Sequence, residues 1–363
     1  MSPALARSWA LPALGRLPPY RANIYRAIFL LAALYNTAFG LWAGFWPQSF
    51  FNIFGMAPTN YPAVWRCLGM VVGVYALLYA YVAWRPEAEG ARPIIAVGLL
   101  GKILGPIGLV SIIASGEWPA RTFSLIVFND LIWWVPFALF LLDDTRLGAR
   151  LRAAAPFICA GLNLAGGAAL ALVLRPGTEA AQFPAAQFPA AADFAGRSAY
   201  ITAHPLLWRG GWLVWMAAAV SLLGFYAWWA SLSGGARPPM PRWAVAGFWL
   251  AAAGLLFDFF AEALYIGWLP ANLDAIQRLG TVLSGGAANG LYTLGGIVLT
   301  LATPAWRRPW LRWLAWAVWL SGIVLSLSSL AGFVPGLVVS GAALFLCFCP
   351  FAFLMGWVEK SKP

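Results

Sequence analysis

The chain alternates long apolar stretches with short segments that carry arginine, acidic residues and proline. Each apolar stretch has about 18 or more nearly uncharged residues, enough for a helix to cross roughly 30 Å of hydrocarbon. The strict alternation that a membrane β-barrel requires is missing. The pattern predicts ten membrane-spanning helices, at about residues 24–45, 64–84, 94–115, 123–142, 156–174, 212–231, 244–269, 281–303, 313–331 and 334–357.

Composition agrees with this prediction. Of the 363 residues, 62% are hydrophobic and 10% are charged, whereas soluble domains have about 25% charged residues. Backbone groups within lipid must be satisfied internally, which favours helices. We therefore expect an all-α, polytopic membrane protein.

The formal charge of +11 reflects topology rather than a nucleic-acid partner, because the basic residues stand in short clusters between the apolar stretches. With the N-terminus in the cytoplasm, sixteen of the 23 lysines and arginines fall in cytoplasmic segments and six on the other side, Lys102 being the remaining one. This asymmetry predicts that both termini are cytoplasmic. No signal-peptide layout precedes the first span, so we expect a multi-pass protein of the cell (cytoplasmic or inner) membrane.

The polar connection DDTRLGARLRAAA, residues 143–155, divides the spans into four and six. We therefore expect a cytoplasmic N-terminal segment at 1–23, a four-helix unit at 24–145 and a six-helix unit at 146–363. The second unit contains the longest loop, at about 175–211, which we place outside the cytoplasm. Its tandem AAQFPAAQFPAA is compositional and indicates a tolerated insertion.

The first unit resembles a known family. The stretch FGLWAGFWPQSFFNIFGM, followed by RCLGMVVGVYALLYAYVA, is similar to the small four-helix membrane proteins grouped around DoxX. In those proteins a first helix ends in a proline-containing interfacial stretch, and an arginine opens a glycine-rich second helix. The resemblance covers about residues 24–142. It implies a compact four-helix bundle, sometimes associated with quinone-linked or redox systems, and it assigns no catalytic residues.

Lys102 is a charge inside an otherwise apolar span. Such residues usually face the bundle interior and have a partner. At 1.5 Å per residue, Lys102 lies about 12 Å and Asp130 roughly 18 Å above the same membrane face, and Asn36 is level with Asp130. Pro106 removes the hydrogen bond that the carbonyl of Lys102 would accept. We expect Lys102 and Asp130 to pair.

Two interpretations of this polar group stay open. The pair locks two helices together, or it belongs to a ligand- or proton-binding pocket beneath Trp133 and Trp134, with Tyr75 among its walls. Arg66, near the end of the second span, either anchors the chain at the interface or binds a ligand carboxylate.

A second polar group lies in the six-helix unit. In LLFDFFAEALYIGWLP, Asp258 and Glu262 are four residues apart and share a helical face. Asn289 and Tyr292 in SGGAANGLYTLGG lie at a similar depth in the next span. Two neighbouring carboxyls in a low dielectric do not both ionise readily, so we expect a shared proton. Alternatively, both acids are protonated and only pack the helices, or Glu262 reaches outward to the interface.

Cofactor chemistry has little support in the sequence. The single histidine, His204, excludes bis-histidine haem and multi-histidine metal centres within this chain. Walker, dinucleotide-binding, HExxH and GxSxG motifs are missing. We therefore expect no metal site and no cofactor.

Three functions remain. The first is binding, and acid–base conversion, of a hydrophobic small molecule such as a lipid, quinone or isoprenoid. The second is proton-coupled transport through Asp258 and Glu262. The third is a non-catalytic role in a membrane redox complex, with a membrane-protein partner or a second copy of the chain. Candidate catalytic residues are Asp258, Glu262, Asp130 and Lys102; candidate ligand-binding residues are Asn36, Tyr75, Trp133, Trp134, Asn289, Tyr292 and Arg66.

Overall fold

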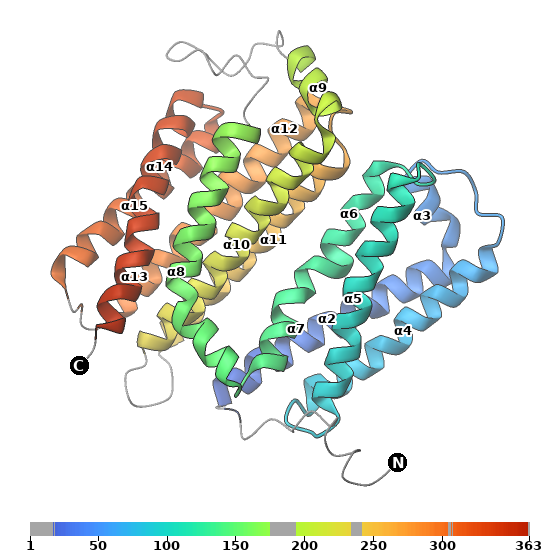
Figure 1. Cartoon of the computed structure of the whole chain (residues 1–363), viewed down its shortest axis with the longest axis horizontal. Coiled ribbons are helices and arrows are strands. Elements are labelled where there is room, and N and C mark those ends of the chain that lie inside the picture. Colours follow the sequence, from blue (N-terminus) through green and yellow to red (C-terminus); the bar gives the residue numbers. More distant parts are fainter. Residues whose placement is uncertain are drawn as a thin grey trace. The chain divides into compact units, whose positions relative to one another are not determined.

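The computed structural model describes residues 17, 19–174, 194–233, 242–303, 306 and 308–361. Regular structure in these residues is helical, without strands (Figure 1). Ten helices of this described part are long and apolar enough to cross a membrane. The protein is thus an all-α, polytopic membrane protein. The tandem repeat and the first sixteen residues of the expected N-terminal segment lie outside the described residues.

The chain divides into two compact units, residues 1–149 and 150–363. The first contains four spans. Its elements are α2 (Pro19–Phe45), α3 (Pro47–Ile53), α4 (Pro62–Trp84), α5 (Ala91–Ala114), the 3₁₀ turn η1 (Ala120–Thr122), α6 (Phe123–Ile126), the π-helical η2 (Val127–Leu131) and α7 (Ile132–Leu142). The turn η1, α6, η2 and α7 together make the fourth span.

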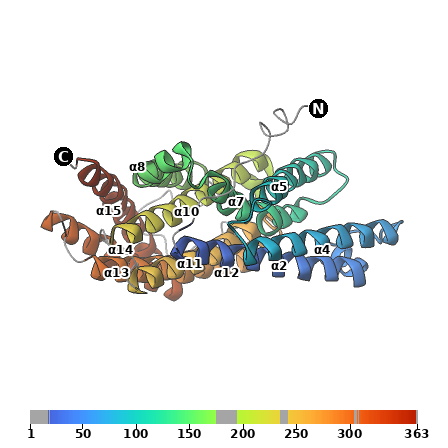
Figure 2. The same cartoon turned by 90° about the horizontal axis from the view of Figure 1, so that it is seen from below.

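Six spans follow, seen at a second angle in Figure 2. They are built from α8 (Arg146–Ala169), within which the division between the units falls, the π-helical η3 (Leu170–Leu174), α10 (Pro205–Ser233), α11 (Arg242–Gly267), α12 (Leu273–Thr281), the π-helical η6 (Val282–Ala288), α13 (Asn289–Ala302), α14 (Pro309–Ala331) and α15 (Val334–Lys360). The short helix α9 (Phe194–Ala203) precedes α10.

Local sequence signals set several helix ends. Proline occupies the first turn of α3, α4, α14 and α15, where its missing N–H has no helical partner to lose. Gly332 ends α14 at φ +64°, a left-handed conformation that glycine adopts without a steric penalty. These two signals separate α14 from α15 with a very short connection.

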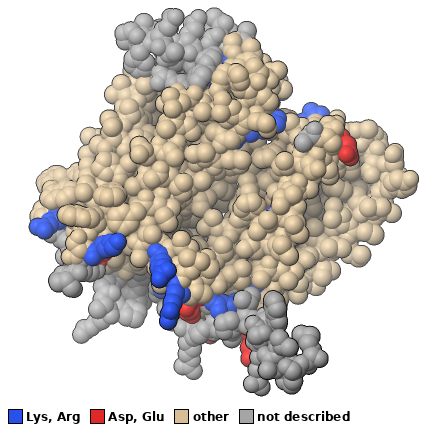
Figure 3. All heavy atoms as spheres, in the orientation of Figure 1, with Lys and Arg blue, Asp and Glu red and all other residues tan. Residues whose placement is uncertain are grey.

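The surface of the spans is apolar. Leucines on several helices are exposed, among them Leu77, Leu172 and Leu346, each more than 70% exposed. On the face seen in Figure 3, nearly all of the described surface is formed by uncharged residues. A soluble protein rarely exposes contiguous apolar area of this extent, so this surface suits contact with lipid chains.

Each unit has its own aromatic core. In the first unit Phe29, Phe137 and Phe140 are fully buried, with Tyr79 beside them. Helices α2 and α4 approach each other closely at Gly44 and Gly69, away from this core, since a Cβ on Gly69 would lie 2.8 Å from the backbone nitrogen of Gly44. Small residues permit such close helix crossings in membranes.

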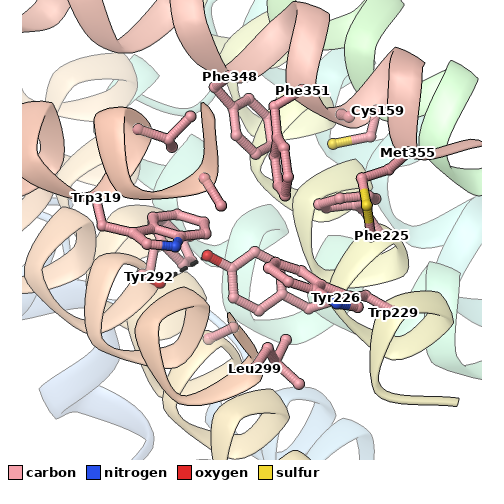
Figure 4. Packing of buried hydrophobic residues seen from close by; sticks show 14 of the residues in the cluster. Cys159, Phe225, Tyr226, Trp229, Tyr292, Leu299, Trp319, Phe348, Phe351 and Met355 are labelled. Atoms are coloured by element: carbon pink, nitrogen blue, oxygen red, sulfur yellow. Dashed lines mark hydrogen bonds between the residues drawn. The ribbon is translucent and has the colours of Figure 1, made fainter. Parts of the chain in front are cut away.

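In the second unit the core gathers around Tyr226, Trp229, Trp319 and Phe351 (Figure 4). The hydroxyl of Tyr226 donates to the backbone oxygen of Tyr292 at 2.6 Å, which ties α10 to α13. The buried polar tips of these aromatic residues have partners, as expected for Tyr and Trp in a core.

Candidate functional site

Lys102 and Asp130 lie together inside the first unit. Lys102 Nζ is 4.0 Å from Asp130 Oδ1, and both residues are 6% exposed. The ammonium also donates to the backbone oxygen of Asn129. Asn129 Nδ2 in turn donates to Asp130 Oδ1 at 3.0 Å. The lysine therefore has one ion-pair partner, Asp130, and one hydrogen-bond acceptor, Asn129 O, and both come from η2.

The π-helical winding of η2 leaves backbone oxygens that can accept hydrogen bonds from side chains. Its wider i→i+5 turn departs from the α-helical ladder, and two of its backbone oxygens accept from side chains. Phe128 O accepts from Trp133 Nε1 at 3.0 Å, and Asn129 O accepts from Lys102. Such π-segments are frequent at functional sites, but here the groups bind one another.

Pro106 frees the carbonyl of Lys102, and the structure shows what occupies it. Trp134 Nε1 donates to this oxygen at 2.8 Å. The backbone and the side chain of Lys102 are therefore both held by the fourth span. This arrangement matches the interpretation in which the pair locks two helices together.

The other residues predicted for the first unit are dispersed. Asn36 Nδ2 makes only a 3.5 Å contact with Val72 O, and its Oδ1 is buried without a partner. Tyr75 is half-buried against Tyr79. Trp133 is buried beside Tyr35, and Arg66 is exposed. Arg66 therefore does not face the buried pair.

The sequence did not reveal a third ionic group, at Asp143. The sequence pattern places this residue in the polar connection 143–155, yet it is only 1% exposed. Its carboxylate accepts from Arg21 at 2.9 Å and from Tyr25 at 2.8 Å, while Arg92 donates to its backbone oxygen. The three donors come from α2 and α5, so Asp143 ties the end of α7 to both helices.

The second unit differs because one of its two acids, Asp258, adjoins a cavity of about 130 Å³. All six spans of the unit contribute to the lining. Asp258 of α11 forms part of the polar wall. Its Oδ1 accepts from Ser284 Oγ at 2.5 Å and its Oδ2 from Tyr292 Oη at 3.3 Å. Two hydroxyl groups therefore donate to the Asp258 carboxyl, and the indole of Trp215 also lies beside it.

Glu262 lies one turn further along α11 and has a different environment. It is 0% exposed, and neither carboxyl oxygen has a hydrogen-bond partner. The interpretation in which Glu262 reaches outward to the interface is therefore wrong, because the side chain is enclosed by the unit. A buried polar group without a partner costs roughly 1–3 kcal/mol. No hydrogen bond joins Glu262 to Asp258 in the structure, and the shared proton stays a prediction.

Asn289 and Tyr292 both line the cavity. Tyr292 reaches Asp258, whereas Asn289 Nδ2 donates to Gly322 O and Ser326 Oγ of α14, each at 2.8 Å. Asn289 therefore ties α13 to α14 at the edge of the cavity. Of these two residues, only Tyr292 hydrogen-bonds to Asp258.

Ser284 is the cavity residue that helical periodicity misses. On an α-helix, residues 284 and 289 would lie about 140° apart. Both nevertheless line the cavity, because η6 winds with the i→i+5 turn of a π-helix. The sequence signal that could have identified it is the small-residue run SGGAAN, which allows such a winding.

Aromatic side chains also line the cavity. They are Trp215, Tyr226, Trp319, Phe345 and Phe348, and Figure 4 shows Tyr226, Trp319 and Phe348 converging near Tyr292. Asn163 and Thr293 add further polar atoms. No sequence pattern groups these residues, because they come from five different helices.

The single histidine is separate from this cavity, and the described residues form no metal cluster. His204 is exposed between α9 and α10, beside the ring of Tyr200. Among the described residues, no three His, Cys, Asp or Glu side chains gather where they could hold a metal ion.

Comparison with protein-family models, with curated proteins and with solved structures found no match to this chain. The resemblance to DoxX-like proteins therefore rests on the residues that suggested it.

Proposed function

We propose that the six-helix unit binds a hydrophobic small molecule, such as a lipid, a quinone or an isoprenoid, with its head group in the cavity beside Asp258. The observation that supports this is a cavity lined by a carboxyl, by hydroxyl groups and by aromatic rings. Ligand sites have this character, mostly apolar with a few placed polar groups. Any acid–base conversion of the ligand runs through Asp258, the carboxyl that lines the cavity.

The volume of the cavity limits which part of a ligand can enter it. Sites for drug-sized ligands have volumes of roughly 300–1,000 Å³, and this cavity has about 130 Å³. The cavity therefore takes a head group, and the rest of the molecule lies elsewhere.

Mass spectrometry of the protein purified in mild detergent tests the proposal. We expect a stoichiometric small molecule that is retained by the wild type and by Asp274→Asn and lost from Asp258→Asn. Asp274 is the matched control because it is exposed on α12, where it pairs with Arg278 at 2.6 Å. Loss of the molecule from both variants, or retention by both, would count against a site at Asp258.

Glu262 favours a second candidate, proton-coupled transport. A carboxyl that is fully buried without a hydrogen-bond partner is suited to hold a proton, because nothing beside it stabilises a charge. It lies one helical turn from Asp258. We expect the Glu262→Gln variant to fold and insert normally. It should no longer take up the transported molecule into vesicles when a proton gradient is applied. Normal uptake by the Glu262→Gln, Asp258→Asn double variant would exclude this function.

The distribution of basic residues supports a topology with both termini in the cytoplasm, in the cell membrane. Reporter fusions after Arg242 should read cytoplasmic, and fusions after Asp274 extracytoplasmic. The reverse pattern would invert the topology without changing the span count.

For the first unit we keep the DoxX-like relationship as a proposal. Its support is the proline-containing interfacial stretch, which forms α3, and the arginine that precedes the glycine-rich part of α4.

A further inference from the structure

The charge around the cavity is unbalanced. Among the described lining residues, Asp258 is the one charged side chain, and no lysine, arginine or histidine is present. The ion pairs found in the described part of the chain do not include Asp258. An enclosed carboxylate without a basic partner is costly unless another positive group approaches it.

Hydrogen bonds satisfy the Asp258 carboxyl only in part. Ser284 Oγ and Tyr292 Oη both donate to the carboxyl, one to each oxygen. A charged carboxylate has about four acceptor positions, so Ser284, Tyr292 and the neighbouring indole of Trp215 leave at least one position free. Glu262 has no such donors, and the two acids therefore differ in role although they share a helix face.

The aromatic wall also favours a positive ligand. Trp215, Tyr226 and Trp319 border the cavity together with Tyr292. Trp and Tyr ring faces attract cations, and clusters of such rings recognise quaternary ammonium groups. A ring cluster beside an unpaired carboxylate is thus complementary to an organic cation.

We infer that the head group bound beside Asp258 is an organic ammonium, either a quaternary ammonium or a protonated amine. This inference rests on the proposed function and narrows its ligand class. A neutral quinone ring would leave the charge of Asp258 unbalanced, and an anion would be repelled by it. The cavity of about 130 Å³ suits a group of this size.

Choline and its uncharged isostere, 3,3-dimethylbutan-1-ol, test the inference on the purified protein by isothermal titration calorimetry. The two molecules have nearly the same shape and differ in charge. We expect choline to bind at least about 30-fold more tightly than the alcohol, since losing one partner of a buried charge pair costs about 2 kcal/mol or more. Asp258→Asn should remove this preference, and Asp274→Asn should retain it. Sodium chloride at the same ionic strength should not compete.

The outcomes separate this inference from the proposed function. Equal binding of the alcohol and choline would overturn the ammonium inference and leave a hydrophobic-ligand site. Competition by sodium would also overturn it, in favour of an inorganic cation. If neither probe binds and no small molecule co-purifies, the proposed function fails as well. The wild-type comparison needs no variant, so poor folding of Asp258→Asn would not prevent the test.

A second arm identifies the source of the ammonium. Protein in nanodiscs of phosphatidylcholine is compared with protein in phosphatidylglycerol nanodiscs. A free amine should bind equally in both. A lipid head group should already occupy the site in phosphatidylcholine and weaken choline binding there.

Discussion

Each of the two units buries charged groups within its spans, and the two treat them differently. In the first unit Lys102 neutralises Asp130, and both backbone and side chain of the lysine have partners on the fourth span. In the second unit Asp258 has hydroxyl donors but no basic partner and adjoins a cavity. Glu262 has no partner at all.

This difference separates structural from functional polar groups. A paired charge satisfies its own electrostatic requirement, so it holds helices together without needing a ligand. An unpaired carboxyl beside a cavity is maintained at a cost in stability, and groups held at such a cost concentrate where proteins bind or react. This difference is the basis on which we propose a functional site in the second unit.

The largest expected effect breaks the pair of the first unit. Lys102→Met leaves Asp130 buried without its counter-charge and should destabilise the protein by about 3–5 kcal/mol. Adding Asp130→Leu should restore part of this loss, because no lone charge then remains. Unfolding in detergent, followed by a double-mutant cycle, measures the coupling. Purely additive losses would show that the two side chains do not interact.

A smaller effect is expected at Asp258, and on binding rather than on folding. Asp258→Asn keeps the shape of the side chain and can still hydrogen-bond to Ser284. We expect ligand binding to weaken by about 30-fold or more, equivalent to about 2 kcal/mol, with a melting temperature of the ligand-free protein close to that of the wild type. A large drop in that melting temperature would make Asp258 a structural residue like Asp130.

Glycine contacts in the first unit should alter stability alone. A Cβ on Gly69 would meet the backbone of α2, whereas a Cβ on Gly73 has no neighbour within 4 Å. Overpacking costs about 1–3 kcal/mol and the better helix propensity of alanine returns up to about 1 kcal/mol. Because the new Cβ would meet helix backbone, Gly69→Ala should lose about 2 kcal/mol. Gly73→Ala is the control and should be neutral or stabilising. Ligand retention, followed by mass spectrometry, should not change in either variant.

The smallest expected effect concerns Trp134. Trp134→Phe removes the indole donor to the carbonyl of Lys102 and should cost about 1 kcal/mol of unfolding free energy. Denaturant unfolding in detergent measures it. An unchanged stability would indicate that water replaces the indole N–H, and the first unit would then be less tightly fixed than we describe.

The sequence predicted the ten spans well because hydrophobic length alone determines them. It also predicted the depth match of Lys102 with Asp130 and the shared face of Asp258 with Glu262, since both follow from regular helix geometry. It missed Ser284, because a π-helical segment shifts the face of the helix. Asp143 was missed because a charged residue beside a turn gives no sign that it folds inward.

Some features depend on packing between helices and have no local sequence signal. The wall formed by Trp215, Tyr226 and Trp319 assembles residues from α10 and α14 that are about a hundred positions apart in the chain. The isolation of Glu262 likewise depends on what its neighbours fail to offer. Periodicity indicates which face of a helix is polar, and it does not indicate which groups on another helix meet that face.

Native mass spectrometry of three proteins in mild detergent tests most directly whether the second unit holds the functional site. The proteins are the wild type, Asp258→Asn and the double variant Lys102→Met with Asp130→Leu. We predict that the wild type and the double variant retain the same bound small molecule and that Asp258→Asn has lost it. Retention by Asp258→Asn together with loss from the double variant would contradict the account and move the site to the first unit.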